Sequence, residues 1–319
     1  MPWRERLGRY MAGRLPSATN VEVAHTGYMP AGASNDTIAL DLGYECDGHR
    51  YQLPLVLRPQ RADGILAPYD VERQFKIMRA LAGSNVPVPA VAFYETDDEV
   101  MGAPFYLMER VQGETLPLFW YGGASPRLAS VAEMLATIHA VDWRALGLEF
   151  LLPAQGAASA LECDLAPWRA RAAHAGLDQH RSLLSLGSFL ARNEPGDTRH
   201  ALLHGDPNPG NYLLRGNEVA AVLDWEVAAI GDPRSDLGFY AALLTVFGGM
   251  PGKAGRTLLS DAYEQVIGRP LDNLAYYEAV GLYKMAIVMS RWAGHAGLAF
   301  GLDTIARRLD FVVGPAWAT

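Results

Sequence analysis

"LLHGDPNPGNYLLRGNEVAAVLDWEVAAIGDPRSDLG", residues 202–238, sets several polar side chains between short apolar runs. Within it, NYLLRGNEVAAVLD is divided by the turn pair Gly-Asn at 216–217, a pattern that predicts a β-hairpin. In an antiparallel hairpin the start of the first strand lies beside the end of the second. The sequence therefore predicts that Asn211 and Asp224 lie side by side, with Asp206 in the loop that enters the hairpin.

These three side chains offer two carboxylates and an amide, and the set contains no His or Cys. Such a donor set suits Mg²⁺ rather than zinc, because Mg²⁺ prefers oxygen ligands and is often held by one or two carboxylates with substrate phosphates. The chemistry that this indicates is phosphoryl transfer. The alternative is that the three are ordinary turn and cap residues.

The N-terminal third has the alternation and turn signals of a small antiparallel sheet. Strands are expected over residues 21–28, 35–45 and 50–59 and in the segments VPVPAVAFYE and APFYLMERV. The pair Asp47-Gly48 predicts a tight hairpin turn. A helix is expected over 69–83, with Asp70 as its N-cap and Gly83 as its stop.

The remaining elements are predicted to be helical. Trp3, Leu7, Tyr10 and Met11 have amphipathic helical spacing near the N-terminus. Further helices are expected over 126–143 and around 177–193, 235–248, 257–267, 273–293 and 302–313. The fold class is therefore α+β, with a strand-rich lobe over residues 1–110, a helical lobe over 111–319 and a cleft between them.

Composition excludes several classes of partner. Charged residues make up only 19% of the 319 residues and the net charge is −8, which argues against nucleic acid. Cys46 and Cys163 are far apart and indicate a reducing compartment. The N-terminus lacks the apolar stretch of a signal peptide, and the longest charge-free run is too short to cross a bilayer. We expect a cytoplasmic protein without a membrane partner; the sequence carries no signal for an oligomeric state.

Two motifs carry a resemblance to a known family. HGDPNPGN followed by LDWE resembles the catalytic and metal-binding loops of aminoglycoside phosphotransferase-like kinases, which share the protein-kinase architecture. LATIHAVDWRALGLE, YLMERVQG and AAIGDPRSDLG further resemble the kinase-like branch found fused to acyl-CoA dehydrogenases. The resemblance runs from about residue 20 to 290 and implies a bilobal protein-kinase-like fold with ATP (or GTP) and Mg²⁺ as cofactors.

Carried over by position, the resemblance makes Asp206 the catalytic base that accepts the acceptor's hydroxyl proton. It makes Asn211 and Asp224 the Mg²⁺ ligands, while His204 would brace the loop and Asp236 would cap or bond its backbone. For Asp232 a capping role is favoured. Glu226 either assists the metal or orients its loop.

On the nucleotide side, MPAGASN corresponds to the phosphate-covering loop, in which Gly32, Ser34 and Asn35 would meet phosphate oxygens. The alternative is a simple hairpin turn. FYLMERVQG resembles the hinge between lobes. The backbone of Glu109 and Val111 would then meet the adenine edge, with Met108 behind the ring.

The sequence departs from the family at the phosphate clamp. Kinases place a Lys at the end of strand three, paired with a Glu on the next helix. Here Arg58 stands at the Lys position and Gln74, on the apolar stripe of its helix, at the Glu position. Since Arg can bind phosphate bidentately and Gln can accept an N–H, we interpret the pair as a modified clamp. The alternatives are a solvated charge at Arg58 and a non-catalytic nucleotide-binding pseudokinase.

The sequence contains few signals that identify the acceptor. Aromatic side chains that either line its pocket or belong to the core are Trp120, Tyr121, Trp168, Tyr276, Tyr277, Tyr283 and Trp292. A dense acidic patch, which a polycationic aminoglycoside would need, is not evident. We expect a less charged hydroxylated small molecule or a hydroxyacyl thioester. The alternative is an antibiotic-resistance phosphotransferase for aminoglycosides or macrolides.

Overall fold

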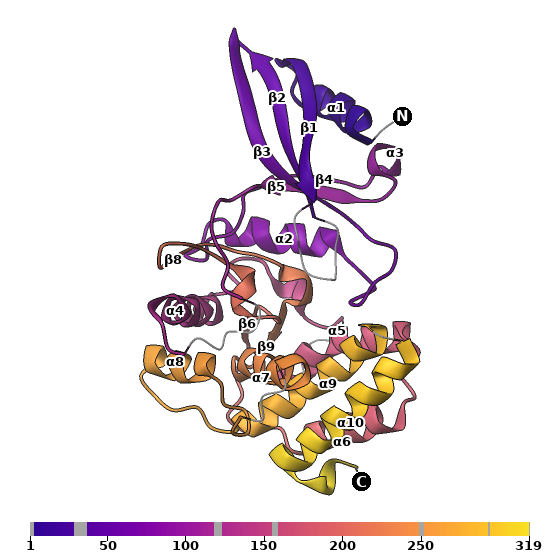
Figure 1. Ribbon diagram of the computed structural model, residues 1–319, viewed down its shortest axis with the longest axis vertical. Coiled ribbons are helices and arrows are strands. Elements are labelled where there is room, and N and C mark those ends of the chain that lie inside the picture. Colours follow the sequence, from indigo (N-terminus) through magenta and orange to yellow (C-terminus); the bar gives the residue numbers. More distant parts are fainter. Residues whose placement is uncertain are drawn as a thin grey trace. The chain divides into compact units, whose positions relative to one another are not determined.

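The computed structural model describes residues 3–28, 37–117, 123–154, 159–248, 252–292 and 294–318. The chain divides into two compact units. The first consists of Met1–Gly83 and Val88–Gln112, and the second of Ser84–Pro87 and Gly113–Thr319. An antiparallel sheet forms most of the first unit and helices form most of the second (Figure 1), so the predicted α+β class is confirmed.

The first unit contains a five-stranded antiparallel sheet in the order β1-β2-β3-β5-β4. The strands are β1 (Thr19–Tyr28), β2 (Ile38–Cys46), β3 (His49–Pro59), β4 (Val91–Glu95) and β5 (Phe105–Glu109). Asp47 and Gly48 join β2 to β3 with φ angles of 49° and 74°. Two successive left-handed residues match the twist of a tight hairpin, and the predicted turn is confirmed.

The described part of this unit also contains the helices α1 (Trp3–Arg14), α2 (Val71–Leu81) and α3 (Asp98–Met101). Helix α1 lies beside β1 (Figure 1) and buries Leu7 and Met11 in the core of the sheet. At the start of α2 the Asp70 carboxylate accepts the Arg73 N–H at 2.9 Å, which confirms the predicted cap. The helix ends at Leu81, two residues before the predicted stop at Gly83.

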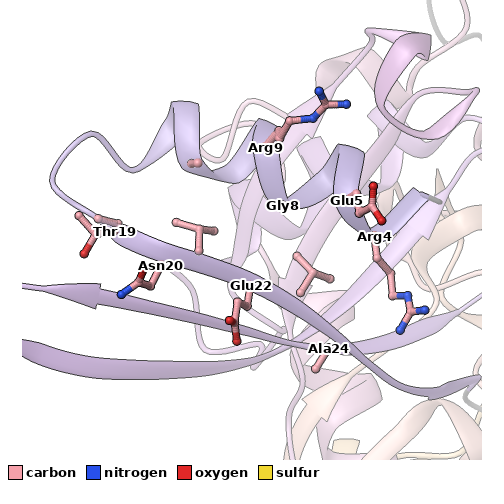
Figure 2. Close-up of a pocket in the computed structure, with 12 residues that line it drawn as sticks. Arg4, Glu5, Gly8, Arg9, Thr19, Asn20, Glu22 and Ala24 are labelled. Carbon is pink, nitrogen blue, oxygen red and sulfur yellow. The ribbon is translucent and has the colours of Figure 1, made fainter. Parts of the chain in front are cut away.

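A groove of about 750 Å³ lies between α1 and β1, which is an edge strand of the sheet (Figure 2). Arg4, Gly8 and Arg9 line it from the helix, and Asn20 and Glu22 line it from the strand. None of the predicted site residues that the structure describes is among its lining residues. The groove is therefore separate from the candidate site.

The second unit is mainly helical. Its helices are α4 (Pro126–Ala140), α5 (Ala160–His174), α6 (Arg181–Arg192), α7 (Arg234–Gly248), α8 (Leu258–Ile267), α9 (Leu274–Trp292) and α10 (Gly294–Val313). Two short antiparallel ladders join them, formed by β6 (Ala201–Leu203) with β9 (Ala229–Gly231) and by β7 (Tyr212–Arg215) with β8 (Glu218–Val222). Short 3₁₀ turns occupy Glu149–Leu151, Pro209–Asn211, Trp225–Val227 and Pro315–Ala318.

Helix α5 was not predicted from the sequence, because Pro167 in its interior is a helix-breaking signal. Helices α7 and α9 approach closely at Gly238, where an added Cβ would lie 2.1 Å from the Tyr277 carbonyl oxygen. This contact holds α7 against the core, and the first turn of α7 carries Asp236. Among the helices that the structure describes, none is long and apolar enough to cross a membrane.

Candidate active site

The predicted hairpin forms and brings Asn211 next to the segment that precedes Asp224. Tyr212 pairs with Val222, and the Leu223 N–H donates to the Asn211 carbonyl at 2.8 Å. Strand β7 begins at Tyr212, so Asn211 is the last residue of a 3₁₀ turn rather than a strand residue. The predicted hairpin is confirmed, and it pairs Asn211 with Leu223, the residue before Asp224.

The Asp206 carboxylate is held on one side by two amides. Its Oδ2 accepts the Asn208 Nδ2 at 2.9 Å and the Asn211 Nδ2 at 3.2 Å. Asn211 Nδ2 also donates to the Asp206 carbonyl at 2.8 Å. The other oxygen, Oδ1, is buried and has no hydrogen-bond partner among the described residues. One oxygen is therefore fixed by the protein and the other is left to accept a proton donor.

The electrostatic environment makes the Asp206 carboxylate more basic than an exposed one. Burial raises the pKa of the Asp206 carboxyl above its ordinary value. The hydrogen bond from Asn208 opposes this rise, while the nearby negative charge of Asp224 adds to it. Asp224 thus lies close enough for the two carboxylates to repel each other.

His204 braces the loop as predicted. Its Nδ1 accepts the Asp206 N–H at 3.3 Å and its Nε2 donates to the Leu223 carbonyl at 2.8 Å. Since one ring nitrogen accepts and the other donates, the imidazole is the neutral Nε2–H tautomer. The ring thereby connects the loop that carries Asp206 to the strand end that precedes Asp224.

Asp236, which is fully buried, bonds the backbone of this loop as predicted. Its Oδ2 accepts the His204 N–H at 2.9 Å and its Oδ1 accepts the Gly205 N–H at 2.8 Å. Its Oδ2 also contacts His139 Nε2 at 3.0 Å, and His139 Nδ1 lies 2.8 Å from the Tyr263 hydroxyl. Asp236 on α7 therefore contacts the loop and His139 on α4 directly, and it is linked to Tyr263 on α8 through His139.

The backbone on both sides of the site is tightly constrained. Gly205 has φ 87°, and an added Cβ would lie 2.2 Å from the Val227 carbonyl oxygen. Asp224 has φ 63° and ψ 59°, a left-handed conformation that is uncommon for a residue other than Gly and clusters at functional sites. It directly precedes the 3₁₀ turn Trp225–Val227, in which the Glu226 carbonyl accepts Arg171 Nη2 at 3.2 Å.

The donor set fits a magnesium ion. Within the described residues no cluster of three His, Cys, Asp or Glu side chains forms a metal site. Asn211 uses its Nδ2 to bond Asp206, so its Oδ1 is the amide atom that remains for a ligand. One amide oxygen and the Asp224 carboxylate are a small set, which suits an ion that keeps several waters and shares substrate phosphates.

The residues of the predicted phosphate clamp meet within the first unit. Arg58 Nη2 lies 3.5 Å from Gln74 Oε1, and Arg58 Nη1 donates to Thr37 Oγ1 at 2.8 Å. The Tyr106 hydroxyl donates to Gln74 Oε1 at 3.1 Å. Arg58 is only 6% exposed, so the alternative of a solvated strand-end charge is wrong.

Other predicted nucleotide contacts fall at the end of β5 or outside the described residues. Met108 is partly buried and Glu109 is exposed; the Glu109 N–H bonds the Ala90 carbonyl at 2.8 Å. Any contact from Glu109 to a base would therefore come from its carbonyl. Val111 follows in a loop and is partly buried. Gly32, Ser34 and Asn35 lie outside the residues that the structure describes.

Asp232 acts as a cap, as predicted: its carboxylate accepts the Arg234 N–H at 3.0 Å. Most of the candidate acceptor aromatics belong to the core. Trp168, Tyr276, Tyr277 and Tyr283 are at most 8% exposed, whereas Trp292 is 50% exposed. Trp120 and Tyr121 lie outside the described residues.

Sequence reasoning missed five residues that support the site: Asn208, His139, Tyr263, Thr37 and Tyr106. Asn208 was detectable, because an Asn two residues after an Asp can bond it locally. The other four act across 21 to 124 positions of sequence and left no local signal.

Comparisons with known proteins identify the family of this chain. Residues 29–269 match the model of the phosphotransferase enzyme family. The chain is 31% identical over 219 residues to acyl-CoA dehydrogenase family member 11 of Homo sapiens, which covers 66% of this chain and 27% of that protein. This chain thus spans about a quarter of that relative's length.

Solved structures share the fold. A Ralstonia eutropha protein assigned to the aminoglycoside phosphotransferases superposes with a TM-score of 0.64 and 24% identity, covering 98% of this chain and 96% of the other. Aminoglycoside phosphotransferase APH(4)-Ia, in complex with ADP and hygromycin B, superposes with a TM-score of 0.54 and 16% identity, covering 97% and 99%. Because the family match includes most of the chain, the protein belongs to the phosphotransferase enzyme family and has the kinase-like fold of the aminoglycoside phosphotransferases.

Proposed function

We propose that this chain is an ATP- and Mg²⁺-dependent phosphotransferase that moves the γ-phosphate to a hydroxyl group of a small molecule. The main support for the proposal is the hydrogen bonding of the Asp206 carboxylate. Two amides fix its Oδ2, while its buried Oδ1 has no hydrogen-bond partner among the described residues. A general base needs such an oxygen, because the acceptor hydroxyl must donate to it.

In this mechanism Asp206 Oδ1 accepts the hydroxyl proton of the acceptor as the acceptor oxygen attacks the γ-phosphorus, the bond from that phosphorus to the β,γ-bridging oxygen breaks and ADP leaves. Asn208 and Asn211 keep the carboxylate in place through Oδ2. Asn211 Oδ1 and the Asp224 carboxylate would hold Mg²⁺, which supplies positive charge to the phosphate oxygens when bound. Asp236 keeps the loop backbone fixed through the His204 and Gly205 N–H groups.

We propose that the nucleotide binds to the first unit. Arg58 would bind phosphate oxygens, oriented by Gln74, and the backbone of Glu109 and Val111 would meet the base in front of Met108. The phosphate-covering loop with Gly32, Ser34 and Asn35 would complete the site. Support comes from the buried clamp around Arg58 and from the ADP complex of APH(4)-Ia. GTP is the alternative nucleotide.

For the acceptor we propose either a less charged hydroxylated small molecule or a hydroxyacyl thioester. The match to part of a protein named as an acyl-CoA dehydrogenase family member supports an acyl thioester. A second candidate is an antibiotic phosphotransferase, favoured by the hygromycin B complex of APH(4)-Ia. Expression in a susceptible host with growth on aminoglycosides and macrolides separates the two.

The direct test is transfer of label from γ-labelled ATP to a panel of hydroxyacyl-CoA thioesters, hydroxylated metabolites and antibiotics, with Asp206→Asn as the blank. Metal-dependent labelling of one acceptor class identifies the substrate. Nucleotide binding that persists without metal, with no turnover on any acceptor, would instead indicate a pseudokinase.

Replacing Arg58 tests the nucleotide site. We expect Arg58→Ala to raise the KM for ATP by more than about threefold, a loss above about 0.7 kcal/mol, because the guanidinium would no longer meet phosphate. Steady-state ATP kinetics on the identified acceptor measures this. The matched control is Arg50→Ala on the same strand, whose side chain is 76% exposed. A change below threefold for Arg58→Ala removes this residue from the nucleotide site.

Replacing Asp224 tests the metal site. We expect Asp224→Asn to weaken Mn²⁺ binding in the presence of ADP by about tenfold or more, because a neutral amide is a poorer ligand for a hard cation. The amount of free Mn²⁺ is measured by electron paramagnetic resonance. Asp261→Asn, a change at a surface ion pair on α8, serves as the control. Equal Mn²⁺ affinity in both variants would contradict the assignment of Asp224.

A further inference from the structure

Gln74 is a buried amide at the centre of a four-residue contact group. Its side chain is on α2 and only 1% exposed. Arg58 and Tyr106 are cross-strand partners on β3 and β5, and Thr37 directly precedes β2. Arg58 contacts both Thr37 and Gln74, and Tyr106 contacts Gln74. The group lies wholly within the first unit.

The orientation of this amide is fixed by its neighbours. A guanidinium can only donate, so the atom of Gln74 that faces Arg58 Nη2 at 3.5 Å must be the carbonyl oxygen. The same Oε1 accepts the Tyr106 hydroxyl at 3.1 Å. Exchanging the amide oxygen and nitrogen would bring two donors together. The Nε2 group must therefore lie on the opposite side of the amide.

Gln74 Nε2 is buried and has no hydrogen-bond partner among the described residues. Buried amide donors are nearly always paired in native proteins, and an unpaired one needs an explanation. The donor lies next to a guanidinium in a position where the family resemblance places a phosphate clamp. A negatively charged oxygen is the partner that both groups can bind.

The chemistry differs from that of the usual Lys and Glu pair. A Glu at this position could only accept, so it would orient the cation and could not itself bind an anion. An amide performs both roles, since Oε1 orients Arg58 while Nε2 remains a donor. We propose that Gln74 Nε2 donates directly to a phosphate oxygen of the bound nucleotide, next to Arg58. This inference rests on the proposed function and adds a second phosphate-binding group to it.

A double-mutant cycle separates direct binding from an effect through Arg58. Gln74→Met is made in the unmodified protein and in Arg58→Ala, and the binding of ADP and of adenosine is measured by calorimetry. If Nε2 contacts phosphate, Gln74→Met weakens ADP about tenfold, or about 1.4 kcal/mol, in both backgrounds and leaves adenosine unchanged. If Gln74 only orients Arg58, the substitution has no further effect in the Arg58→Ala protein, and the proposal is overturned.

Two further variants keep the test decisive. Gln52→Met, an exposed position on β3, controls for the loss of a glutamine from the same sheet and should not change ADP binding. If Gln74→Met does not fold, Gln74→Leu replaces it in both backgrounds, because it removes the same amide donor and adds no charge. An unchanged ratio of ADP to adenosine affinity then refutes the inference.

The outcomes also distinguish this inference from the proposed function. If the unmodified protein binds ADP and the loss disappears in the Arg58→Ala background, the role of Gln74 fails and the proposed function stands. If the unmodified protein binds neither ADP nor adenosine, both fail.

Discussion

Asp206→Asn is expected to lower kcat for phosphoryl transfer by about 10³-fold, within the range of about 10² to 10⁴ that a general base contributes. The amide keeps the size of the carboxylate but cannot accept the acceptor's proton with the same basicity. Asn208 and Asn211 donate to the Asp206 carboxylate oxygen in the native protein, and an amide oxygen can take that place. We therefore expect ADP binding to remain within about threefold of the native value.

Transfer kinetics and ADP calorimetry on the same preparation measure this pair of effects. Asp303→Asn, at an exposed position on α10, is the matched control and should leave kcat unchanged. A kcat within tenfold of the native value for Asp206→Asn would exclude Asp206 as the base. A parallel loss of ADP binding would show instead that the substitution disrupts the loop.

Asp236→Ala is expected to have the largest effect on stability, lowering the free energy of unfolding by about 3–5 kcal/mol. The side chain is fully buried and accepts the His204 and Gly205 N–H groups while it contacts His139. Removing it leaves two backbone donors buried without an acceptor. Asp236→Asn retains one acceptor oxygen, so it should lower the free energy of unfolding by a smaller amount.

Chemical denaturation measures the free energy of unfolding of the native protein, Asp236→Ala and Asp236→Asn. Asp261→Ala is the control, because its ion pair with Arg256 is on the surface and such pairs contribute about 1 kcal/mol or less. If Asp236→Ala is no less stable than Asp261→Ala, the carboxylate does not hold the loop. Catalysis should also fall in Asp236→Asn, since the loop that carries Asp206 loses one of its two anchors.

The stability contributed by Asp236 should depend on pH. Burial alone would raise the pKa of the Asp236 carboxyl, but the hydrogen bond and charge of His139 and the Gly205 N–H outweigh it, and the pKa is lowered. A lowered pKa means that this contribution is complete above the unfolded value of about 3.9 and is lost as pH falls through the folded value. The stability difference between the native protein and Asp236→Ala should therefore shrink on acidification.

The local part of the site followed from the sequence. The Gly-Asn turn and two short apolar runs predicted the hairpin, and hairpin pairing then placed Asn211 next to the residue that precedes Asp224. The cap at Asp70 and the turn at Asp47-Gly48 were predicted for the same reason, since each depends on hydrogen bonds or dihedral angles within a few residues. Helix α5 was not predicted, because Pro167 interrupts its sequence pattern.

The sequence by itself thus determined the α+β class, the hairpin, the cap and the tight turn, because periodicity and turn chemistry are encoded over short spans. Only the tertiary structure decided which polar groups are buried together. His139 reaches Asp236 across 97 positions and Tyr106 reaches Gln74 across 32, because the packing of helices and strands brings them into contact. Which atoms are left without a partner, such as Asp206 Oδ1 and Gln74 Nε2, depends on every neighbour that packing supplies. No local pattern encodes that property.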